Sequence, residues 1–117
     1  MYFKFMILRI DNHVNDKDGS LVESITPAFD DEGKPILMAM PLGFKGKTVL
    51  KMIVNRNSPN KHEQAAPIEF PIEAKDLIDA FNNFTKFRDM EIDNMRSIAV
   101  KRQMAGGPKV EFEILEG

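Results

Sequence analysis

The chain has 117 residues, no cysteine and a formal net charge of −2, with 43% hydrophobic and 29% charged residues. This length and composition indicate one globular domain, residues 1–117, and exclude a disordered chain, a disulfide scaffold and thiol chemistry. The apolar runs are far shorter than the roughly 20 residues of a transmembrane helix, and no cleavage site follows the apolar start. We therefore expect a cytoplasmic protein that does not interact with membranes.

The N-terminal half predicts strands separated by turns. Residues 3–10 are apolar on both alternating faces, which indicates a well-buried strand near the centre of a sheet. Clusters of turn-forming residues follow at 12–20 and 30–35, and the segment between them predicts a strand that Pro27 interrupts.

A hairpin is predicted next. Residues 36–42 and 47–55 have the composition of two strands, and the tight connection Gly43-Phe44-Lys45-Gly46 lies between them. Residues 55–67 contain two prolines, three asparagines and a serine, and they predict a long polar loop.

The C-terminal half predicts one clear helix. After a short strand at 68–72, apolar residues recur at helical spacing over about 73–86, and we expect the apolar side to be buried: Leu77, Ile78, Phe81 and Phe84. Alternation at 88–92 then predicts a strand, and the segments 98–103 and 110–114 predict a closing hairpin. The expected fold class is α+β, with a mainly antiparallel sheet, one principal helix packed on it and a C-terminal β-hairpin.

No pattern in the sequence identifies an active site. Asn15-Asp16-Lys17-Asp18-Gly19 lacks the remaining ligands of a calcium loop, and the two histidines lie singly in polar segments. Gly46-Lys47-Thr48 lacks the preceding glycine and the following helix of a phosphate-binding loop. We therefore expect a non-enzymatic protein with no catalytic residue, no metal and no cofactor.

Positive charge is concentrated in the middle of the chain. Residues 35–66 contain five basic residues against Glu63 alone, a local charge of +4: Lys45, Lys47, Lys51, Arg56 and Lys61. Alternation places the first three lysines on one face of a strand, and the other two cations follow in the expected loop. A basic strip of this kind attracts phosphates even when the whole protein is acidic.

The same region resembles a known family. Phe44-Lys45-Gly46-Lys47, the strand after it, Ile68-Glu69-Phe70 and the following helix resemble the positive-cofactor-four and Whirly-type proteins that bind single-stranded DNA, over residues 40–87. The resemblance implies a curved antiparallel sheet followed by a helix, a dimer and single-strand binding. The aromatic, glycine-rich segment of that family is missing from residues 55–66.

Two functional hypotheses follow. In the first, the basic strand and loop bind single-stranded nucleic acid, with Phe44 stacking on bases and the cations Lys45, Lys47, Lys51, Arg56 and Lys61 contacting phosphates. In the second, the domain is a protein-interaction or assembly module, such as a small virus-type regulator or a dimeric scaffold, that uses an edge strand or a Met/Phe surface. The acidic net charge favours the second hypothesis, and the local basic segment and the family resemblance favour the first. We adopt single-stranded nucleic-acid binding as the prediction from the sequence, because it is the more testable of the two, and keep the interaction module as the alternative. In both we expect a homodimer, because unpaired strand edges favour association.

Overall fold

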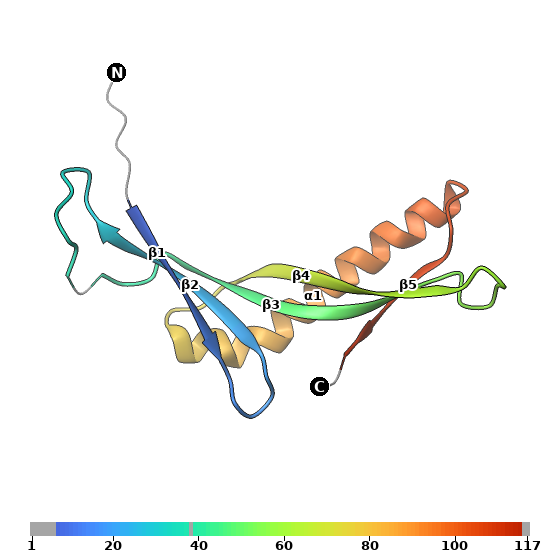
Figure 1. Cartoon of the computed structure of the whole chain (residues 1–117), viewed down its shortest axis with the longest axis horizontal. Helices are drawn as coiled ribbons and strands as arrows, with labels where there is room; N and C mark the ends of the chain where they lie inside the picture. The colour runs from blue at the N-terminus through green and yellow to red at the C-terminus, as the bar shows by residue number, and fades with distance from the viewer. Residues whose placement is uncertain (1–6, 38, 116–117) are drawn as a thin grey trace, which may run out of the picture.

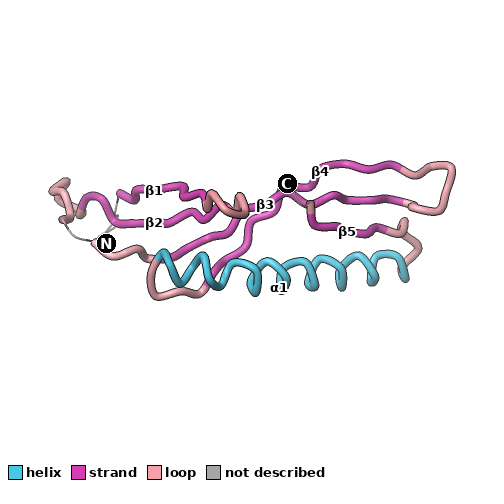
Figure 2. The backbone as a smooth tube through the Cα atoms, turned by 90° about the horizontal axis from the view of Figure 1, so that it is seen from below, coloured by secondary structure: helices cyan, strands magenta, loops and turns pink. Residues whose placement is uncertain are grey.

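The computed structural model describes residues 7–37 and 39–115. It is an α+β structure in which an antiparallel sheet is covered on one face by a single long helix (Figures 1 and 2). The elements in chain order are β1 (Ile7–Val14), β2 (Leu21–Phe29), β3 (Gly43–Val54), β4 (His62–Ile72), α1 (Leu77–Met104) and β5 (Val110–Ile114).

The long strand β3 organises the sheet. One edge of β3 pairs with β4 along its whole length, from Phe44 opposite Ile72 to Val54 opposite His62. The other edge is shared, because its first part pairs with β2 and its last part pairs with β5. Strand β1 then pairs with β2 and lies at the border of the sheet (Figure 1).

Helix α1 runs along one face of the sheet for most of the length of the molecule (Figure 2). It begins after Asp76, whose carboxylate accepts a hydrogen bond from the Asp79 backbone amide at 2.8 Å, as expected of an N-cap. Neither glycine nor proline occurs between Leu77 and Met104. The helix ends at Ala105, and Gly106 follows with φ of 96°, a left-handed conformation that glycine adopts without strain.

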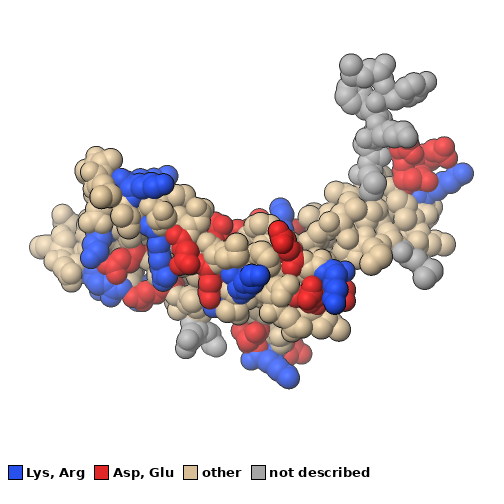
Figure 3. Space-filling view, turned by 180° about the vertical axis from the view of Figure 1, so that it is seen from behind, with Lys and Arg blue, Asp and Glu red and all other residues tan. Residues whose placement is uncertain are grey.

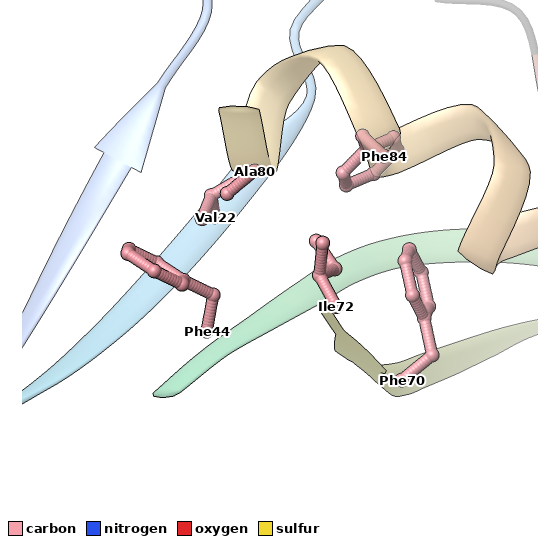
Figure 4. Close-up of a cluster of buried hydrophobic side chains, with 6 residues drawn as sticks. All are labelled: Val22, Phe44, Phe70, Ile72, Ala80 and Phe84. Atoms are coloured by element: carbon pink, nitrogen blue, oxygen red, sulfur yellow. The ribbon is translucent and has the colours of Figure 1, made fainter. Parts of the chain in front are cut away.

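The main buried cluster lies between the N-terminal half of α1 and strands β2, β3 and β4. The rings of Phe70 and Phe84 meet edge to face with centroids 5.1 Å apart. This geometry is favourable for aromatic pairs. Figure 4 shows the buried cluster, which consists of Val22, Phe44, Phe70, Ile72, Ala80 and Phe84.

The structure corrects the prediction for the first strand. Residues 7–10 do form a strand, but it extends to Val14, lies at the border of the sheet and leaves Ile7, Leu8 and Ile10 exposed. Residues 3–6 of the predicted strand lie outside the described residues. An apolar sequence shows that a segment needs burial, but it does not show which part of the fold covers that segment.

The predicted hairpin of residues 36–42 and 47–55 is also wrong. The described residues of 36–42 form no strand, and Gly43-Phe44-Lys45-Gly46 belongs to β3 itself instead of forming a turn. These residues are extended because they pair with β2 on one side and with β4 on the other. The predicted strand with Pro27 is confirmed as β2.

The second half of the predicted loop at 55–67 is strand. Only residues 55–61 connect β3 to β4, and the segment from His62 onward pairs with β3. Pro67 lies in this strand, since proline is compatible with an outer strand when its missing amide faces away from the neighbouring strand, whereas Pro59 does lie in the connection.

The helix is much longer than the predicted 73–86. The predicted strands at 88–92 and 98–103 are both helical, and the segments 98–103 and 110–114 therefore form no hairpin, because β5 pairs with β3 instead. Phe84 is buried as expected, whereas Leu77 and Phe81 are half-buried and Ile78 is 74% exposed. Within the described residues, no helix is both long enough and apolar enough to cross a membrane.

Candidate functional site

Phe44, the residue expected to stack on bases, lies in the core. Its side chain is 6% exposed and packs in the cluster between the sheet and α1 (Figure 4). The register places Phe44 between Ser24 of β2 and Ile72 of β4, on the face that the helix covers. The ring is therefore not available as a stacking surface in this conformation.

Lys45, Lys47 and Lys51 lie on the opposite face of β3, as alternation predicts. Lys47 does not point freely into solvent there. Its Nζ lies 2.6 Å from Oε2 of Glu23 and 3.5 Å from Oε1 of Glu69. The hydrogen bond with Glu23 is the main reason that the pKa of Lys47 is raised above its ordinary value. The positive charge of Lys47 is thus matched by carboxylates from β2 and β4.

Lys51 and Lys61 share one carboxylate, that of Glu63 on β4. The Nζ–Oε distances are 2.9 Å for Lys51 and 3.2 Å for Lys61. Hydrogen bonds from Lys51 and then Lys61 lower the pKa of Glu63 below its ordinary value. The ammonium groups therefore hold this glutamate in its charged form.

Arg56 is also engaged, at the junction of β3 with the following turn. Its Nε lies 3.1 Å from Oε2 of Glu111, and its Nη2 contacts Oε1 of Glu113, both on β5. The bond with Glu113 is the main reason that the pKa of Arg56 is raised. Lys109 adds a second cation to Glu111 at 3.6 Å.

We call this array of ion pairs the ion-pair layer, and it lies on the face away from the helix, across β2, β3, β4 and β5. Its members are Glu23, Lys47, Lys51, Arg56, Lys61, Glu63, Glu69, Lys109, Glu111 and Glu113. Lys45 is the one predicted cation for which no ion pair occurs among the described residues, and it is exposed. Figure 3 shows Lys and Arg intermixed with Asp and Glu on the face it presents. The predicted cations do share one region, but each cluster of them contains glutamates, so no unbalanced basic groove forms.

A second candidate surface is the outer edge of β1. The Asn15 backbone amide donates to the Ser20 carbonyl at 2.9 Å, which extends the ladder in which Val14 pairs with Leu21. In an antiparallel ladder, the backbone groups of alternate residues point to opposite sides. The odd-numbered residues of β1 therefore bond to β2, and the amides and carbonyls of Ile10, Asn12 and Val14 point outward.

The side chains of β1 divide into two faces. His13 pairs with Val22, which packs against the helix, so the odd-numbered side chains share the helix side of the sheet. There Arg9 Nε contacts Asp11 Oδ2 at 2.8 Å, and the His13 ring lies 3.0 Å from Ser24 Oγ. Exposed Asn12 and three apolar residues occupy the even-numbered positions on the opposite face. The three form an apolar patch whose members are about half exposed: Leu8 at 46%, Ile10 at 57% and Val14 at 58%.

The outer edge of β4 is protected, in contrast to that of β1. The Asn55 amide donates to the Lys109 carbonyl at 2.9 Å, so the odd-numbered residues of β3 bond to β5 and the even-numbered ones bond to β4. The outward positions of β4 consequently include Pro67 and Pro71, which have no amide hydrogen. Proline and charge on an outer strand are known to prevent further strand pairing.

The outer edge of β5 is short and partly covered. The strand has five residues. The guanidinium of Arg96 on α1 donates to the carbonyl of Phe112 at 3.2 Å, on the side away from β3. Of the outer strands in residues 7–37 and 39–115, β1 therefore has the most accessible pairing edge.

A hollow of about 440 Å³ lies between the β1–β2 turn, the middle of β3 and α1. Asp18 on its rim accepts hydrogen bonds from the Ser20 hydroxyl at 2.7 Å and the Ser20 amide at 2.9 Å. The hydroxyl bond is the main reason that the pKa of Asp18 is lowered. This carboxylate is thus an ionised acceptor that shapes the turn.

The β1 edge was not predicted from the sequence, because the apolar pattern of residues 3–10 indicated a strand at the centre of the sheet. One feature of the sequence does indicate which outer edge is open to pairing. Both prolines of β4 occupy outward positions, where they prevent further pairing, whereas residues 7–14 contain no proline. Comparison with protein-family models, curated proteins and solved structures gives no significant match for this chain. The resemblance to single-stranded-DNA-binding proteins therefore stays a prediction.

Proposed function

We propose that this protein is a non-enzymatic protein-interaction module that binds an extended polypeptide segment along the outer edge of β1. The observation that carries the proposal is the contrast between the outer edges of the sheet, which β1, β4 and β5 form. Pro67 and Pro71 block β4, and Arg96 covers part of β5, whereas the outward backbone groups of β1 pair with no other strand in the described part of the chain and lie beside an apolar patch.

The energetics favour a partner that covers the apolar patch as well as the backbone. Each added main-chain hydrogen bond contributes about 0.5 to 1.5 kcal/mol. Association costs about 4 to 15 kcal/mol in lost motion and ordering, so a few such bonds alone give weak binding. Covering the half-exposed side chains of Leu8, Ile10 and Val14 adds about 1 kcal/mol each, which is half of the usual value for complete burial.

The shape of the molecule is consistent with this function. Its radius of gyration is 18.7 Å and its extents are 59 × 43 × 20 Å. A compact domain of this length has a radius of gyration of about 13 Å. Figure 2 shows α1 beneath a long sheet, and no helix covers the other face within the described residues. Such a flat and elongated domain offers long strand edges for pairing.

Photo-crosslinking tests the proposal. A photoreactive amino acid replaces Asn12, whose backbone groups point out from β1, and the protein is irradiated in the cells that make it. The matched control carries the same amino acid at Ala65, an exposed position on the outer side of β4 beside Pro67. We expect a discrete protein adduct from position 12 and none from position 65. Absence of any adduct at position 12 would contradict the proposal.

Single-stranded nucleic-acid binding remains a prediction of the sequence. It requires the cations of the ion-pair layer to exchange their glutamates for phosphates, and it requires a stacking surface other than Phe44. An oligonucleotide titration described in the Discussion distinguishes this possibility.

A further inference from the structure

We infer that the segment bound by β1 is the β1 strand of a second copy of this chain, arranged antiparallel about a two-fold axis at Ile10. This inference rests on the proposed function of the β1 edge and names its partner. It would join two sheets into one continuous sheet through their border strands β1.

The backbone limits the possible registers. The outward amides and carbonyls belong to even-numbered residues, so a symmetric antiparallel pair must place even-numbered residues opposite one another. Within β1, a two-fold axis that pairs at least five residues can then lie at Arg9, Ile10, Asp11 or Asn12. An axis at Arg9 places this cation opposite the partner's Arg9, which destabilises the pair, and the side chains on the helix side of the strand discriminate between the other three registers.

An axis at Asp11 places this carboxylate opposite the partner's Asp11. Like charges directly opposite each other destabilise a strand pair. An axis at Asn12 places Asp11 opposite the partner's His13, but that ring already contacts Ser24 Oγ at 3.0 Å. This register also overlaps only residues 10–14 of the strand.

An axis at Ile10 is complementary in charge. It places Arg9 opposite the partner's Asp11 and Asp11 opposite the partner's Arg9, and it overlaps residues 7–13. Arg9 already contacts Asp11 within the chain at 2.8 Å, so the four groups would alternate in sign across the axis. On the other face, Ile10, which is 57% exposed, would pack against the partner's Ile10.

The absence of native cysteine allows a direct test of this register. A single cysteine can form a symmetric disulfide only near a two-fold axis, because the two Cα atoms must lie within about 7 Å. Three variants of the full chain are compared under mild oxidation: Ile10→Cys, Asp11→Cys and Asn12→Cys. We expect the Ile10→Cys variant to form a covalent dimer at least about tenfold faster than the other two.

Charge reversal provides an independent readout by sedimentation equilibrium. Arg9→Asp alone and Asp11→Arg alone should each weaken the dimer by about tenfold. The double reversal should restore the dissociation constant to within about threefold of wild type, because it restores opposite charges across the axis. A purely structural role of either residue would not produce this rescue. Circular dichroism checks that each variant is folded.

The outcomes separate this inference from the proposed function. Fastest crosslinking at position 11 or 12 overturns the register, and failure of the charge rescue overturns the Arg9–Asp11 complementarity. A chain that stays monomeric at high micromolar concentration, while photo-crosslinking at position 12 captures a different protein in cells, overturns self-pairing and leaves the proposed function standing. A monomer with no adduct at position 12 overturns both.

Discussion

The ring of Phe70 occupies the space that a side chain on Gly46 would fill. The two residues are cross-strand partners on the helix side of the sheet, where the Phe70 ring also meets Phe84. A Cβ atom on Gly46 would overlap the ring of Phe70 and closely approach that of Phe84. Glycine at position 46 therefore serves the packing of the aromatic pair.

Gly46→Ala should destabilise the fold by about 1 to 3 kcal/mol, because the added methyl group forces buried rings from their positions. Gly43→Ala is the matched control, since β3 begins at Gly43 and a methyl group added there would meet no atom within 4 Å. Urea unfolding of both variants measures the difference. Equal stability of the two variants would show that Phe70 moves aside without strain.

A second prediction concerns the two faces of α1. Phe84 is 5% exposed and belongs to the core, whereas Ile78 is 74% exposed. Phe84→Ala should cost about 3 to 5 kcal/mol of unfolding free energy. Ile78→Ala should stay within about 0.5 kcal/mol of wild type. Thermal or urea unfolding compares them, and a large loss in the Ile78 variant would indicate that a partner or a second copy covers that face.

A third prediction concerns acid stability. Lys51 and Lys61 lower the pKa of Glu63, so the folded state binds this proton less tightly than the unfolded state does. The stabilisation is present above the ordinary pKa of glutamate, about 4.3, and is lost as the pH falls through the lowered value. Glu63→Gln should therefore reduce the loss of stability between pH 7 and about pH 3.

The readout is urea unfolding at low salt, where exposed ion pairs are least screened. Glu73→Gln serves as the control, because Glu73 is exposed and forms no ion pair among the described residues. The same acid sensitivity in wild type and Glu63→Gln would mean that the lysines do not stabilise the charged carboxylate.

A fourth prediction tests the ion-pair layer against nucleic-acid binding. Glu23→Gln combined with Glu63→Gln removes the nearest carboxylates of Lys47 and Lys51. This double variant should bind a fluorescent single-stranded oligonucleotide more tightly than wild type. Its slope of log affinity against log salt should be steeper by about 0.7 for each phosphate newly contacted.

The control for this titration is Asp31→Asn combined with Glu73→Gln, which changes the net charge equally at exposed positions away from the ion-pair layer. We expect little change in affinity from the control. Tight, salt-dependent binding by the wild type itself would instead support the single-strand hypothesis and would show that phosphates displace the glutamates.

Several elements were determined by the local sequence. Strand β2 was predicted with its observed bounds because turn-forming clusters enclose it on both sides. The helical spacing of apolar residues over 73–86 predicted a helix in this part of the chain and the burial of Phe84. These features depend on neighbouring residues, whose periodicity and turn propensity are visible in the chain.

The tertiary structure decided the rest. Alternation of apolar residues over 88–103 resembled strands, but packing against the sheet maintains one continuous helix there. The strand that contains Phe44 has two faces, and only its pairing with β2 and β4 beneath the helix decides that this ring is buried and Lys47 is not. The partners of the cations lie on other strands, up to 57 residues away in the case of Arg56 and Glu113. Sequence alone determined which residues carry charge or need burial, whereas strand order determined which charges are neutralised and which edge stays open, because both depend on contacts between distant segments.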